Sequence, residues 1–131
     1  MDSSSVELAG SEVESITVDG GTVILRFSRA CIIKTMTGSV ERTRWWQAGD
    51  LVFERAEVEG EIPDCPAVCA GGDVGENVYT YRDMLPIPLK SQGCTHCNLR
   101  FEGTDLRLVV QGETVDLKLE DRPHYIGHIK P

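Results

Sequence analysis

The sequence predicts an all-β protein: an antiparallel β-sandwich or a partly open β-barrel of about eight to ten short strands, with little helix. Apolar residues recur at every second position through the last third of the chain, which is the period of a half-buried strand. Glycine-bearing turn sequences separate these apolar stretches. No long stretch has the apolar period of an amphipathic helix.

The first half of the chain is expected to begin with a β-hairpin whose turn is at Asp19-Gly20. Asp-Gly is a strong hairpin sequence because both turn residues must tolerate positive φ. The β-branched and aromatic stretch that follows fits a strand, and the turn-prone residues 48–50 are expected to separate two later strands. Strands after this turn are therefore expected at 22–27, 31–36, 43–47 and 51–58.

The second half of the chain combines a glycine-rich segment with a regular strand pattern. Residues 59–77 hold two prolines and four glycines and are expected to form a long functional or mobile loop. Pro86 and Pro88 remove two backbone donors, which confines their segment to an edge strand or an extended crossover. Residues 97–120 predict a three-stranded meander, with its second turn at 111–113. The alternating apolar residues of this meander are expected to share one core: Leu99, Phe101, Leu106, Leu108, Val110, Val115, Leu117 and Leu119.

Length and composition limit the class of protein. The 131 residues fit a single all-β domain, 1–131, that can bury a core without disulfides, and residues 1–12 are expected to be mobile. No secretory signal is visible and the longest apolar runs are too short to span a membrane, so a soluble protein is expected. The net charge of -8 argues against a nucleic-acid or acidic-membrane partner. Five cysteines without an export signal favour a reducing compartment, the cytoplasm.

Two cysteine pairs, Cys65 with Cys69 and Cys94 with Cys97, form the first candidate site. Two closely spaced thiol pairs on separate loops are the usual way to build a four-cysteine zinc site. The second pair has the usual two-residue spacer, whereas three residues separate the first pair. Reduced thiols packed as small apolar groups are the favoured interpretation, zinc is the alternative cofactor, and a disulfide is the third possibility.

Trp45 and Trp46, with Arg42 and Arg44, form the second candidate site, a ligand or partner surface. Adjacent residues on a strand point to opposite faces, so if one indole lies in the core the other faces outward. An outward indole suggests a dimer contact or the wall of a ligand pocket. The alternative is that a bulge or a covering element buries both rings.

The sequence contains no motif that assigns a reaction. The favoured hypothesis is a non-enzymatic cytoplasmic binding or protein-interaction module that associates with itself through the tryptophan strand. A basic stretch at 26–44 and an acidic stretch at 50–76 fit docking between subunits as well as pairing within one fold. A small enzyme with a cleft near residues 59–77 and a zinc-stabilised structural domain are the alternatives.

Overall fold

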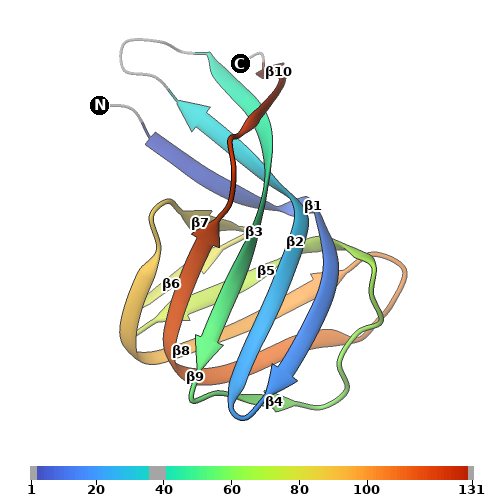
Figure 1. Cartoon of the computed structure of the whole chain (residues 1–131), viewed down its shortest axis with the longest axis vertical. Coiled ribbons are helices and arrows are strands. Elements are labelled where there is room, and N and C mark those ends of the chain that lie inside the picture. The colour runs from blue at the N-terminus through green and yellow to red at the C-terminus, as the bar shows by residue number, and fades with distance from the viewer. Residues whose placement is uncertain (1–2, 36–40, 130–131) are drawn as a thin grey trace.

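The computed structural model describes residues 3–35 and 41–129, so the predicted strand residue Met36 lies outside the described part. All the strands in these residues belong to one sheet (Figure 1). None of the described residues forms a helix long and apolar enough to span a membrane. The strands are β1 (Ser3–Asp19), β2 (Thr22–Thr35), β3 (Arg42–Glu54), β4 (Glu57–Glu59), β5 (Ala67–Glu76), β6 (Tyr79–Arg82), β7 (Met84–Pro86), β8 (Lys90–Phe101), β9 (Arg107–Leu119) and β10 (His124–Ile129).

Six of the strands close into a barrel. Their order is β3, β2, β1, β5, β8 and β9, and β9 pairs back onto β3. The closing pair is antiparallel, from Gly49 opposite Leu119 to Glu54 opposite Thr114. Closure leaves no free edge within the wall, because each of the six strands has two neighbours. The all-β prediction is confirmed, with a closed barrel in place of the sandwich or the partly open barrel.

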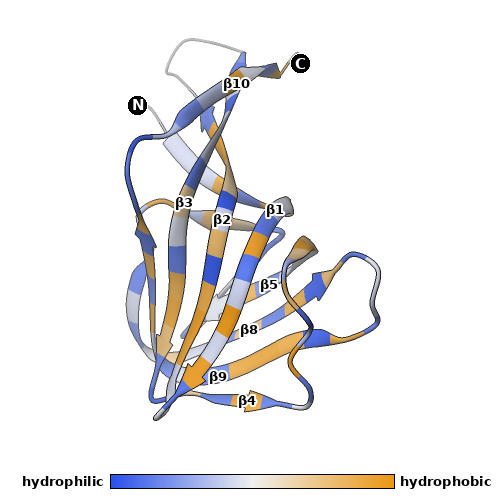
Figure 2. Ribbon diagram, turned by 45° about the vertical axis from the view of Figure 1, so that its right-hand side comes forward, coloured by the Kyte–Doolittle hydropathy of each residue, from blue (hydrophilic) through white to orange (hydrophobic). Residues whose placement is uncertain are grey.

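The barrel interior is filled by the inward-facing side chains of the alternating pattern. Figure 2 shows this pattern as bands of hydrophobic and hydrophilic residues along the barrel strands. Burying one such leucine or phenylalanine contributes about 1.5–3 kcal/mol relative to exposing it. Most of the predicted core of the last third is buried, with Leu117 and Leu119 partly buried against it and Leu106 half-exposed. The buried members are Leu99, Phe101, Leu108, Val110 and Val115.

The strands are longer than the sequence pattern suggested, because two turn-prone segments lie inside strands. β3 runs without interruption through residues 48–50, and β9 runs through 111–113. A Cβ on Gly49 would lie 2.7 Å from the backbone oxygen of Lys118, so this glycine allows β3 and β9 to approach closely. In β9, the buried face changes from even-numbered to odd-numbered positions between Val110 and Val115, where β8 contains a bulge between Gln92 and Thr95. The predicted three-stranded meander is therefore a hairpin of two long strands.

The prediction of a long loop over the glycine-rich residues 59–77 is also corrected. The loop covers 60–66, and the rest of the segment is β5, which forms part of the barrel wall. A Cβ on Gly72 would lie 2.8 Å from the Cα of Leu99, so the glycines here serve close packing of β5 against β8. At the N-terminus, residues 3–12 belong to β1, and residues 3–7 and Glu12 pair with β2, although mobility was expected there.

Three barrel strands continue beyond the barrel and form a second, open part of the sheet (Figure 1). We call this part the extension sheet. β7 pairs with β1 at one edge, which confirms the edge position predicted from Pro86. β10 pairs with Arg42–Trp46 of β3 at the other edge. The extension sheet comprises residues 84–86, 3–7, 31–35, 42–46 and 124–129.

The barrel and the extension sheet separate at residues that make specific hydrogen bonds. The Gln47 side-chain amide donates to the carbonyl oxygens of Glu120 and Asp121, both at 3.1 Å, and so directs the chain from β9 into β10. On β1, the buried Ser11 hydroxyl donates to the Glu7 carbonyl at 2.6 Å and accepts from the Cys31 amide at 2.9 Å. These bonds hold the irregular stretch of β1 between Glu7 and Glu12 against β2.

Candidate functional site

A pocket of about 260 Å³ lies where the extension sheet leaves the barrel, and we call it the Trp46 pocket. Trp46 points to the sheet face opposite that of Trp45, which packs against the core. The irregular stretch of β1 described above supplies one wall of the pocket. The lining residues are Ala9, Gly10, Glu12, Arg29, Cys31, Arg44, Trp46 and Ile126.

The Trp46 ring is held from two neighbouring strands. The imidazole of His124 on β10 stacks on it, with 4.0 Å between ring centroids and 12° between the planes. The Arg29 guanidinium carbon on β2 lies 4.6 Å from the ring centroid. Such a cation–π contact contributes about 0.5–1 kcal/mol at an exposed site and fixes the orientation of the guanidinium. Trp46 is therefore a rigid element of the pocket.

The arginines of this surface differ in their partners. Arg44 lies 3.8 Å from the Glu7 carboxylate. Among the described residues no carboxylate lies within 4.0 Å of Arg29, so its N–H groups are available to a ligand. Arg42 is exposed, two positions before Arg44 on the same face of β3. Three of the four predicted surface residues, Arg42, Arg44 and Trp46, thus share one face. Arg29 belongs to the basic stretch 26–44, but the sequence pattern did not predict that Arg29 and His124 contact Trp46.

Trp45, the fourth residue of the predicted surface, lies on the opposite face of the sheet. Its indole N–H donates to the Thr43 hydroxyl at 2.8 Å, and its ring meets the Tyr125 ring edge-on at 5.2 Å. The Lys34 ammonium lies 4.4 Å from its centroid. Because this half-buried ring packs against the core, Trp45 joins the extension sheet to the barrel and does not line the Trp46 pocket.

The four predicted zinc ligands do not come together. No group of three or more His, Cys, Asp or Glu side chains within residues 3–35 and 41–129 could hold one ion. Cys69 and Cys97 are buried in the barrel wall, Cys94 is exposed at the bulge of β8, and Cys65 is half-buried before β5. On β8, Cys94 is exposed and Cys97 is buried, because positions three apart on a strand face opposite sides. Cys65 lies in the loop before β5, and positions four apart on an extended chain are about 13 Å apart, which separates it from Cys69. The alternative of a four-cysteine zinc site is therefore wrong.

The environment of the thiols also disfavours the reactive thiolate. Burial raises the pKa of Cys97 to about 12. Desolvation by burial likewise raises the pKa of Cys31, Cys65 and Cys69. Since the thiolate is both the nucleophile and the metal ligand, the raised pKa values of these four cysteines lower the fraction that can react or bind a metal near neutral pH.

The two histidines of β10 lie on different faces of the sheet. A register shift between Tyr125 and Gly127 changes the phase of the strand. His124 therefore stacks on Trp46, whereas His128 meets the Tyr125 ring edge-on at 5.8 Å and lies 3.3 Å from the Glu41 carboxylate.

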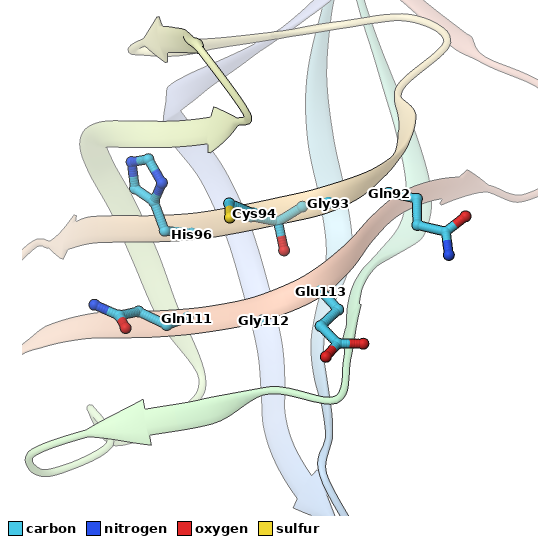
Figure 3. Close-up of a pocket in the computed structure, with 8 residues that line it drawn as sticks. Gln92, Gly93, Cys94, His96, Gln111, Gly112 and Glu113 are labelled. Carbon is cyan, nitrogen blue, oxygen red and sulfur yellow. The ribbon is translucent and has the colours of Figure 1, made fainter.

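A second pocket, of about 510 Å³, follows the β8 bulge on the barrel wall (Figure 3). The Asn77 side chain stabilises the bulge, because it accepts from the Cys94 amide at 3.1 Å and donates to the Gln92 carbonyl at 3.2 Å. The His96 ring lies over Gly75, in the space that a larger side chain there would occupy. The labelled side chains in Figure 3 do not converge on one point, so this pocket lacks the arrangement that acid–base or nucleophilic catalysis needs.

Comparisons of the chain with protein-family models, with curated proteins and with solved structures find no match. What the Trp46 pocket can bind therefore follows from its own side chains. Guanidinium donors on Arg29 and Arg44 lie beside the apolar surfaces of Trp46 and Ile126. Glu12 also lines the pocket and Arg44 is paired with Glu7, so the Arg29 guanidinium is the group that can bind a carboxylate next to an apolar group of the ligand.

Proposed function

We propose that this protein is a non-enzymatic interaction module and that the extension sheet is its docking surface. The partner in this proposal is an extended, acidic protein segment, supplied by a second copy of the chain. The observation that carries the proposal is the Arg29 guanidinium, which stacks on Trp46 and has no acidic partner among the described residues. Its pocket also contains Ile126 of β10, the strand with the open edge.

The open edge belongs to β10. This strand ends the order of the sheet, and within the described residues only β3 pairs with it. Its middle residues Tyr125 and Ile126 are 51% and 55% exposed, a large fraction for apolar side chains. An unpaired edge with exposed apolar side chains can receive another strand through backbone hydrogen bonds. Arg29 and Arg44 in the adjacent pocket would then select an acidic strand.

The same chain carries a suitable acidic segment. Glu57 and Glu59 are exposed on β4, which is the strand at the other end of the order, and Glu61 is exposed in the loop that follows. In Figure 1 the β4 end of the molecule lies far from the extension sheet, so this segment must come from a second copy. The net charge of -8 makes two copies repel each other at long range, so the local contact between the acidic segment and Arg29 must outweigh that repulsion.

The alternative of a small enzyme near residues 59–77 has less support. Much of that segment is β5 in the barrel wall, and the pKa values of Cys65 and Cys69 are raised. We place the module in the cytoplasm, because all five cysteines are free and a reducing compartment keeps them so.

Sedimentation of the wild-type chain and of two charge-reversal variants tests the proposal. Arg29→Glu should weaken self-association about tenfold or more, since it places a carboxylate where the acidic segment docks. Arg82→Glu is the matched control, because Arg82 is exposed, pairs with Asp73 and lies outside both the Trp46 pocket and the acidic segment. A wild-type chain that sediments as a monomer at high micromolar concentration, or equal effects of the two variants, contradicts the proposal.

A further inference from the structure

Two arginines lie directly opposite each other on the outer wall of the barrel. Arg100 of β8 pairs with Arg107 of β9, next to the buried pair of Leu99 and Leu108. Because neighbouring positions on a strand alternate, both guanidinium groups are on the outer face. Like charges directly opposite on one face of a sheet destabilise it, so this pair needs compensation.

The chain supplies only part of that compensation. Asp83 lies 3.5 Å from the Arg100 guanidinium, and Asp73 lies 3.3 Å from that of Arg82 on the neighbouring β6. Arg107 donates to the Asn98 side-chain oxygen at 3.3 Å and has no carboxylate within 4.0 Å in the described part of the chain. Three guanidinium groups thus face two carboxylates here, although the whole chain has 21 acidic and 13 basic residues.

These side chains surround a pocket of about 270 Å³, which we call the arginine pocket. Gly72 of β5 completes its lining. Asp83 is held in place because its carboxylate accepts from the Gly72 amide at 2.9 Å, while its own amide donates to the Gly72 carbonyl at 2.7 Å. A Cβ on the preceding residue, Gly71, would lie 2.6 Å from the Asp83 carboxylate and 2.8 Å from Nη2 of Arg100. Glycine at this position therefore leaves room for the Asp83–Arg100 pair.

We propose that the arginine pocket binds a small oxyanion, the phosphate group of a small ligand, between Arg100 and Arg107. Guanidinium groups present planar pairs of N–H donors that match phosphate oxygens, and each of the three arginines uses one partner within the chain and keeps other donors free. A bound phosphate also removes the repulsion between the opposed arginines. The volume is below the range of about 300–1,000 Å³ that is usual for larger organic ligands, so the ligand is small.

This site is independent of the extension sheet, because it rests on residues of β5, β6, β8 and β9 and of the β6–β7 connection. Its test uses inorganic phosphate at constant ionic strength, with binding measured by calorimetry. Arg107→Gln should weaken binding about tenfold or more. Arg55→Gln, an exposed arginine elsewhere on the surface, is the control and should bind as the wild type does.

Thermal unfolding gives a second measurement that separates binding from folding. Without phosphate, the Arg107→Gln variant should be at least as stable as the wild type, because one of two like charges is gone. Saturating phosphate should raise the midpoint of the wild type and of Arg55→Gln, and leave that of Arg107→Gln nearly unchanged. Absence of saturable phosphate binding by the wild type, or equal weakening by both variants, overturns the proposal.

Discussion

The barrel and the extension sheet use the same three strands, β1, β2 and β3, for different purposes. In the barrel every strand has neighbours on both sides and one face is sealed, so Leu25, Leu51 and Phe53 are at most 1% exposed. In the extension sheet both outer strands have an open edge in the described structure, and the aromatic rings are half-buried or exposed. Closure of the sheet therefore concentrates stability in one half and leaves recognition groups accessible in the other.

The largest expected difference between the two regions is in the free energy of unfolding that is lost when a side chain is truncated to alanine. Leu108→Ala removes a fully buried side chain from the barrel and should cost about 2–5 kcal/mol in the free energy of unfolding. Tyr125→Ala in the extension sheet removes a half-exposed ring and its edge-on contacts with Trp45 and His128, and should cost about 1 kcal/mol. Urea unfolding measures both values. Equal costs would show that the extension sheet is as tightly packed as the barrel.

Two glycine substitutions sharpen the comparison at the backbone level. Gly49→Ala places a methyl group against the Lys118 carbonyl and the Leu119 Cα of the adjacent strand, and should destabilise the barrel by about 1–3 kcal/mol. Gly127→Ala is the matched change in β10, where a Cβ meets no atom within 4 Å. It should be neutral or stabilise by about 0.5–1 kcal/mol, because alanine loses less backbone entropy on folding. Thermal unfolding of both variants decides whether Gly49 is required for strand approach.

Thiol reactivity should distinguish the barrel interior from its surface. In the native protein, Cys94 should react quickly with a disulfide reagent at pH 8, because it is exposed. Cys69 and Cys97 should react only after unfolding, since both are buried and their pKa values are raised. Replacing Cys94 with Ser should remove the fast phase of labelling. Fast labelling of Cys97 in the native state would show that the barrel wall opens near β8.

The smallest expected effect concerns the ion pairs where β9 leaves the barrel. Arg26 lies 2.9 Å from Glu120 and 3.3 Å from Asp50, and the hydrogen bond from Arg26 lowers the pKa of Glu120. A carboxylate with a lowered folded-state pKa adds stability above its unfolded pKa of about 4.3, and this stability is lost as the pH falls through the folded value. Below about pH 4.3, the wild type should therefore lose slightly more stability than Glu120→Gln. If the two proteins lose stability equally as the pH falls, the Arg26–Glu120 ion pair does not contribute to stability.

The period-two pattern was sufficient to predict the all-β class, the first hairpin, whose turn is at Gly20-Gly21, and most of the core of the last third. It missed β5 and the first part of β1. It could not predict how far each strand runs. Glycines such as Gly49 and Gly112 are typical of turns, but here they lie inside strands, where they allow close strand packing and a change of register. The split of β3 between β9 and β10 depends on contacts of Gln47 with residues over 70 positions away. A local pattern carries no information about such contacts.

The local sequence pattern predicted only part of the candidate site, because the rest depends on contacts between distant residues. Adjacent tryptophans on a strand must face opposite sides, and the separation of Trp45 from Trp46 follows from that rule. The partners of Trp46, Arg29 and His124, come from other strands and depend on the register that the fold sets. The favoured interpretation of the cysteines as reduced thiols agrees with the structure, whereas the alternative of a zinc site failed because spacing alone does not show on which face of a strand a thiol lies.

Hydrogen–deuterium exchange of the wild-type chain at low and high protein concentration tests docking on the extension sheet most directly. The account predicts that backbone amides of residues 124–129 and 57–61 gain protection together as concentration rises, because β10 of one copy receives the acidic segment of another. Amides of the closed barrel strands, such as that of Leu108, should show no such change. If neither segment gains protection while the protein self-associates, or if protection rises elsewhere, the extension sheet is not the docking surface.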